Sequence, residues 1–186
     1  MNPIKNKKDL ETTIDELRKY SYSYLEKYNP SKQQLKIYLF KKFLKKREKI
    51  YNKRELFDLI DEVIITLTKQ NLISDKFYSE AKSKALLRKG YSLNKIRYNL
   101  IKKGISEEYI KESISKIKET EIDPDFFSAI KICKKRRIGP MRAEANREIF
   151  YKKDMGILAR SGFSYDISKK ILAMTQKEFF QLLKFT

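Results

Sequence analysis

The segment GYSLNKIRYNLIKKGIS, residues 90–106, carries two copies of a three-residue signal that separates helices. Glycine readily adopts the left-handed conformation that ends a helix, and a serine two positions later can accept the first free N–H groups of the next one. We therefore expect one helix to end at Gly90 and another to begin at Ser106, with a short helix between them. The same signal recurs at residues 162–164.

Weaker signals divide the rest of the chain. Asparagine replaces glycine in residues 29–31 and 71–74, residues 123–125 place a proline between two aspartates, and Thr175 with Glu178 forms a capping-box pattern. Together the signals predict nine helices and a tail that ends in a turn or two. The expected spans are 13–28, 31–46, 54–70, 75–89, 92–103, 106–120, 125–138, 141–161 and 164–173, with the final turns near 176–184.

Composition also favours helices over sheets. Glycine and proline together supply nine of the 186 residues, where average usage predicts about 22, and Val63 is the only valine. A sandwich or barrel of many short strands needs more turn residues than this. We therefore predict an all-α fold.

The predicted helices fall into three sets of three. A serine followed by two apolar residues at four-residue spacing occurs in residues 31–39 and again in 92–100. Three tandem three-helix modules would stack into an elongated, curved, solenoid-like body. The predicted divisions are an N-terminal tail at 1–12, modules at 13–70, 75–120 and 125–173, and a C-terminal tail at 174–186.

Positive charge follows the same repeat. The chain carries a net charge of +19, and residues 32–54, 82–103 and 131–153 contribute +9, +8 and +7. Residues 55–81 and 104–130 each sum to −4. If the modules stack in register, the basic helices form one stripe suited to nucleic acid or an acidic protein surface. The alternative is that these runs are solvated helix faces without a partner.

From this placement we predict a polyanion-binding surface of lysine and arginine side chains. Its members are Lys36, Lys41, Lys42, Lys45, Arg88, Lys89, Lys95, Arg97, Lys102, Lys103, Lys134, Lys135, Arg136, Arg137 and Arg142.

No catalytic, cofactor or metal site is predicted. Histidine is absent, which removes Ser-His-Asp systems and histidine metal sites, and the single cysteine, Cys133, is expected to be a buried structural thiol in a reducing compartment. Neighbouring acids such as 61–62 and 107–108 point about 100° apart on a helix, so they do not converge on one ion. With no apolar run long enough to span a bilayer, we expect a cytoplasmic protein.

Tyrosines crowd the first predicted helix. Tyr20, Tyr24 and Tyr28 follow a four-residue spacing and could stack on nucleic-acid bases. The favoured interpretation is a half-buried helix seam with hydroxyl groups reaching water.

Three motifs in this order resemble the RecX family of bacterial recombination regulators. They are LRKGYS at 87–92, IxxxLxxKGIS at 96–106 and LARxGFS at 158–164, and RRIGP at 136–140 is similar to a variant found in alphaproteobacterial members. The resemblance implies three tandem three-helix repeats and no catalysis. It also implies a protein that lodges in the groove of the RecA filament on single-stranded DNA and suppresses recombinase activity. We expect a monomer.

Two other functions stay open at this point. A general DNA- or RNA-binding module with no recombinase partner would account for the charge, and a nuclease is the weakest reading because no acids converge.

Overall fold

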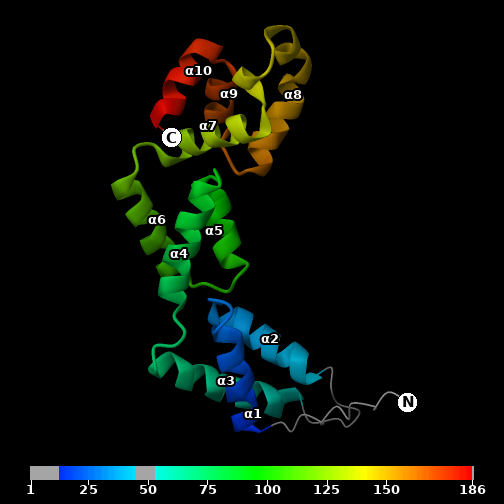
Figure 1. The fold of residues 1–186 in the computed structure, drawn as a ribbon, viewed down its shortest axis with the longest axis vertical. Helices are drawn as coiled ribbons and strands as arrows, with labels where there is room; N and C mark the ends of the chain where they lie inside the picture. The colour runs from blue at the N-terminus through cyan, green and yellow to red at the C-terminus, as the bar shows by residue number, and fades with distance from the viewer. Residues whose placement is uncertain (1–12, 45–52, 186) are drawn as a thin grey trace, which may run out of the picture. The chain divides into compact units, whose positions relative to one another are not determined.

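The computed structural model describes residues 13–44 and 53–185 (Figure 1). Within these residues it contains ten α-helices, two short 3₁₀ helices and no strand, so the predicted all-α fold is confirmed. The chain divides into two compact units, residues 1–78 and 79–186. The predicted N-terminal tail and Lys45 lie outside the described residues.

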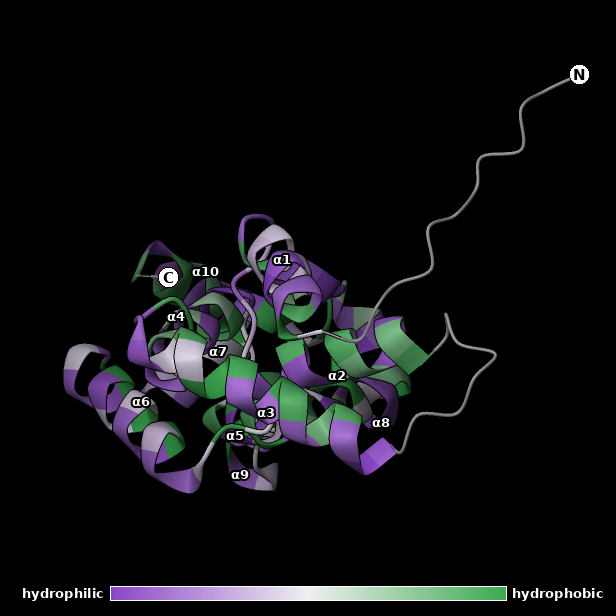
Figure 2. Ribbon diagram, turned by 90° about the horizontal axis from the view of Figure 1, so that it is seen from below, coloured by the Kyte–Doolittle hydropathy of each residue, from purple (hydrophilic) through white to green (hydrophobic). Residues whose placement is uncertain are grey.

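Unit 1 is built from α1 (Ile14–Leu25), α2 (Lys32–Leu44), α3 (Lys53–Lys69) and the start of α4 (Asp75–Arg88). The first three helices pack against one another in every pairing. In Figure 2 hydrophilic and hydrophobic residues alternate along α2 and α3, as expected for helices with one face in a core. The core of unit 1 consists of Leu17, Leu35, Leu39, Phe43, Leu56, Ile60, Val63, Ile64, Leu67 and Ile73.

Unit 2 contains the remainder of α4 and all later helices. The α7, α8 and α9 helices share a core that includes Ala129, Ile130, Leu158 and Ile171, each with no exposed surface. No helix in either described range is long and apolar enough to cross a bilayer. The elements are α5 (Leu93–Ile101), α6 (Glu107–Thr120), α7 (Pro124–Arg136), η1 (Gly139–Met141), α8 (Glu144–Arg160), α9 (Tyr165–Leu172), α10 (Gln176–Leu182) and η2 (Leu183–Phe185).

The predicted helix boundaries are close to the observed ones because the stop and start signals act as expected. Gly90, Gly104 and Gly162 have φ angles of +83°, +74° and +90°, in the left-handed region. The Ser92 hydroxyl accepts a hydrogen bond from the Lys95 N–H at 3.1 Å, which caps α5. Ser106 begins α6 without a side-chain cap.

Three helix ends differ most from the prediction. The helix expected at 13–28 ends at Leu25. The helix expected at 141–161 begins only at Glu144, because residues 139–141 form the 3₁₀ turn η1. The predicted final turns are a complete helix, α10, which begins with a capping box between Thr175 and Glu178.

The same junction between helices occurs twice. The Lys32 N–H at the start of α2 donates to the carboxylate of Asp75 at 2.8 Å, and the Leu93 N–H at the start of α5 donates to that of Asp125 at 2.7 Å. In both cases an aspartate from the first turn of a later helix receives an otherwise unpaired N–H. The module boundaries and the curvature of the stacked body stay predictions.

Candidate nucleic-acid interface

The exposed side of α5 carries an aromatic ring between two cations. Ile96 and Leu100 are fully buried, so the helix turns other side chains outward. Tyr98 is 50% exposed, and its ring centroid lies 4.6 Å from the Lys102 Nζ and 5.5 Å from the Lys95 Nζ. We call Lys95, Tyr98 and Lys102 the α5 cluster.

The segment that carries the α5 cluster is positively charged. Residues 82–103 contain no acid. Arg97, a predicted interface residue, forms an ion pair with Glu107 at 2.8 Å, so its charge is partly offset. A hydrogen bond from Lys102 and the charges of Lys102 and Lys95 lower the pKa of the Tyr98 hydroxyl.

A second group of cations lies at the end of α7. Lys134, Lys135 and Arg136 are exposed in its last turn, where the negative end of the helix dipole stabilises positive charge. Arg137 follows with φ +53°, in the left-handed region that ordinarily favours glycine. We call these four residues the α7 cluster.

The Arg142 guanidinium is paired with a buried carboxylate. The Arg142 Nε and Nη2 donate to the two oxygens of Asp154, each at 2.7 Å. Asp154 is 1% exposed and also accepts the Gly139 N–H at 2.8 Å. Much of the Arg142 charge is therefore already satisfied, and sequence analysis had assigned Asp154 no role.

The predicted cations of unit 1 are also partly engaged. Lys36 forms an ion pair with Asp61 of α3. The Lys42 Nζ lies 3.8 Å from the centre of the Tyr20 ring and donates to the Tyr38 hydroxyl at 3.2 Å. Charge counting along the sequence treats such cations as available, although Asp61 and Tyr20 on neighbouring helices engage them. The remaining described member of this group, Lys41, is exposed.

Within unit 2 the second and third basic blocks meet. A Cβ added to Gly90 would lie 3.0 Å from Ile132 and 3.2 Å from Lys131 of α7, so the corner that follows Arg88 and Lys89 packs directly on that helix. Ser92 supports the arrangement, because its N–H and hydroxyl both donate to the Ser161 carbonyl. One continuous ribbon of charge through all three modules stays a prediction.

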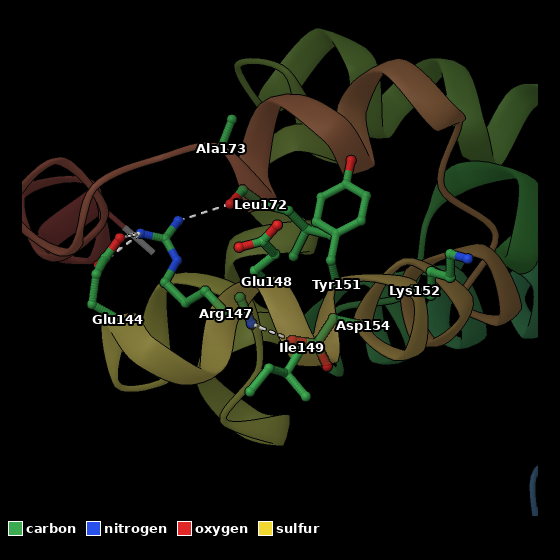
Figure 3. A pocket seen from close by; sticks show the side chains of 10 residues that line it. Glu144, Arg147, Glu148, Ile149, Tyr151, Lys152, Asp154, Leu172 and Ala173 are labelled. Atoms are coloured by element: carbon green, nitrogen blue, oxygen red, sulfur yellow. Dashed lines mark hydrogen bonds and ion pairs between the residues drawn. The ribbon is translucent and has the colours of Figure 1, made fainter.

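A cavity of about 670 Å³ lies beside α8 (Figure 3). Its main cation, Arg147, points towards the end of α9 and donates to the carbonyls of Leu172, at 2.8 Å, and Met174. Arg147 also pairs with Glu144 at 3.2 Å. Because this guanidinium caps the helix end, we assign it a structural role, which the sequence pattern did not indicate.

The tyrosine seam on α1 is packed at two of its three positions. Tyr20 meets Phe43 edge to face at 5.7 Å, and Tyr24 stacks on Tyr38 at 4.1 Å, whereas Tyr28 is 58% exposed. The favoured interpretation as a half-buried seam therefore holds for Tyr20 and Tyr24.

Cys133 is fully buried, as expected for a structural thiol, and burial together with the charge of Asp154 raises its pKa to about 12. Within the described ranges, 13–44 and 53–185, no group of three or more acidic, histidine or cysteine side chains is placed to hold a metal ion.

Comparisons with known proteins agree with the motifs. A family model described as "RecX, second three-helix domain" matches residues 74–114. The regulatory protein RecX of Myxococcus xanthus is 28% identical over 152 residues, covering 80% of each chain. The regulatory protein RecX of Clostridium perfringens strain 13 is 31% identical over 136 residues, which cover 73% of this chain and 62% of that relative, so the match spans less than two thirds of its length.

Two solved structures share the fold. The crystal structure of RecX from Lactobacillus salivarius superposes with a TM-score of 0.59 and 22% identity, over 90% of this chain and 97% of that one. A second crystal structure of regulatory protein RecX gives a TM-score of 0.58 over 85% of this chain and 72% of that one. Motifs, relatives and fold agree: residues 74–114 match the second three-helix domain of RecX, and the chain is similar in sequence and in fold to regulatory RecX proteins.

Proposed function

We propose that the protein inhibits a RecA-type recombinase by binding its filament on single-stranded DNA. The observation that carries the proposal is the meeting of two basic blocks in unit 2, where the corner after Arg88 and Lys89 packs on α7. A filament groove presents DNA phosphates beside the recombinase surface. A protein that contacts both gains affinity because each contact tethers the other.

The available cations are concentrated in unit 2. Lys36, Arg97 and Arg142 have carboxylate partners, and Lys42 is half-buried against two tyrosine rings and donates to the Tyr38 hydroxyl. The α7 cluster and Lys102 are exposed. We therefore assign most of the polyanion contact to the α5 and α7 clusters, and expect binding to weaken as salt rises because phosphate contacts release counterions.

A titration of the full-length protein against RecA on single-stranded DNA tests the proposal. We expect the rate of ATP hydrolysis to fall at substoichiometric to stoichiometric ratios. Unchanged hydrolysis and unchanged filament length by microscopy would contradict it. If the protein instead binds naked DNA or RNA with a steep salt dependence and leaves RecA unaffected, it is a general nucleic-acid-binding protein.

Charge reversal distinguishes the proposed surface from general basicity. Changing Lys102 and Lys103 to Glu is expected to relieve the inhibition while helical content by circular dichroism is unchanged. The matched control changes Lys111 and Lys118 of α6, which are exposed and lie in the acidic stretch 104–130. Equal effects of the two double variants would mean that net charge alone, rather than the α5 end, sets the interaction.

A further inference from the structure

Tyr98, the aromatic residue of the α5 cluster, lies outside the hydrophobic core. Lys95 and Lys102 are seven residues apart, so they lie on one face of the helix with Tyr98 between them. The Tyr98 ring stacks on no other aromatic ring in the described part of the chain, in contrast to Tyr24, which stacks on Tyr38. The ring is half-exposed, and the ammonium groups of Lys102 and Lys95 lie over it at 4.6 Å and 5.5 Å from its centroid, so no group of the hydrophobic core covers it.

The chemistry of this cluster matches an unstacked base with its flanking phosphates. Base stacking on an aromatic side chain uses the π-face that every base has, and lysines beside the ring can contact the backbone. Bases in a duplex already stack on their neighbours, so a ring on the surface of a helix reaches them only in a single strand. Residues 82–103 add no acid that would repel phosphate. An acidic protein surface would satisfy the two lysines but would leave the ring without a specific role.

We infer that the α5 cluster is a base-stacking site for single-stranded DNA, in which a base lies on the ring of Tyr98 and the ammonium groups of Lys95 and Lys102 contact the adjacent phosphates. The inference deepens the proposed function and rests on it for the choice of single-stranded DNA as the ligand. The Lys102 Nζ already lies over the Tyr98 ring, 4.6 Å from its centroid, so the ring and one cation are together before DNA binds.

Fluorescence anisotropy with a fluorescein-labelled thirty-nucleotide oligo(dT) and the full-length protein tests the site. Because stacking is worth about 1–3 kcal/mol per base, Tyr98→Ala is expected to weaken binding by a factor between about 5 and about 150. Tyr98→Phe retains the ring and should bind within about twofold of the wild type. The control is Tyr22→Ala, since Tyr22 is 40% exposed on α1 and lines a pocket with two acids and two bases.

Salt dependence separates stacking from charge. Lys102→Gln should lower the slope of log affinity against log salt by about 0.7, the value for one phosphate contact on a single strand, while Tyr98→Ala leaves the slope unchanged. The chain contains no tryptophan, so Tyr98→Trp supplies a unique fluorophore that oligo(dT) should quench. The inference is overturned if Tyr98→Ala binds like the wild type, or if Tyr98→Phe loses as much affinity as Tyr98→Ala.

The recombinase assay keeps this inference separate from the proposed function. If the wild type slows RecA and Tyr98→Ala changes only that inhibition and not oligo(dT) affinity, the cluster contacts the recombinase and the inference is wrong. If oligo(dT) binding depends on Tyr98 while RecA is unaffected, the stacking site stands and the proposed function fails.

Discussion

Replacing Asp154 removes the group that anchors the loop after α7. Its carboxylate accepts two hydrogen bonds from Arg142 and one from the Gly139 N–H, and it is 1% exposed. Removing one partner of a buried ion pair typically costs about 3–5 kcal/mol, because the other charge is left unpaired. The Arg142 side chain is 20% exposed, which places the expected cost of Asp154→Asn near the lower end, about 3 kcal/mol. Asp154→Ala also leaves the Gly139 N–H without an acceptor, so we expect about 4–5 kcal/mol.

Urea unfolding of the full-length protein, followed by circular dichroism at several wavelengths, measures these losses. The matched control is Glu107→Gln, which breaks the Arg97–Glu107 pair, whose side chains are 51% and 41% exposed. Exposed pairs contribute about 0–1 kcal/mol, so this control should hardly move the midpoint. If Asp154→Asn costs no more than Glu107→Gln, the buried carboxylate is not an anchor and the reasoning is refuted.

Three further predictions concern the backbone and the thiol. Arg137→Gly should raise the free energy of unfolding by about 1 kcal/mol in thermal unfolding, because φ +53° is strained for a residue with a Cβ. The same change should weaken oligo(dT) binding, because it removes a positive charge. A lower free energy of unfolding would show that the Arg137 side chain supports the fold. Gly162→Ala should lower the free energy of unfolding by at least about 2 kcal/mol in the same measurement. The added Cβ would overlap the Ser92 hydroxyl that caps α5, and the φ of +90° is strained for alanine. A decrease below about 0.5 kcal/mol would contradict that packing. Cys133 should resist iodoacetamide at pH 8 in the native protein and react after denaturation, because burial raises its pKa to about 12; rapid native labelling would show that the α7 core opens.

The helix boundaries could be predicted because their causes are local. A glycine that ends a helix and a serine that starts the next act within three residues, as at Gly90 and Ser92. The exposed Tyr98 between two lysines could also have been found, since the spacings of three and four place side chains on one helix face.

Which lysine and arginine side chains form ion pairs within the protein could not be predicted in this way. The Arg142–Asp154 pair spans twelve residues and joins the residue that follows a 3₁₀ turn to the middle of α8, and Lys36 meets Asp61 on another helix. Neither separation is a helical repeat, so a count of lysines and arginines along the chain overestimates how many are available. The left-handed backbone of Arg137 had no signal, because glycine is the residue that ordinarily marks such a site.

The repeated aspartate junction has a consequence for cutting the chain into fragments. A truncation after residue 70 removes Asp75 and leaves the α2 start without the acceptor for its Lys32 N–H, and one after residue 120 does the same to α5 by removing Asp125. The starts of α2 and α5 each depend on the opening turn of a later helix. The first compact unit accordingly extends beyond α3 to Tyr78, so we expect a stable fragment of it to need three helices together with the beginning of a fourth.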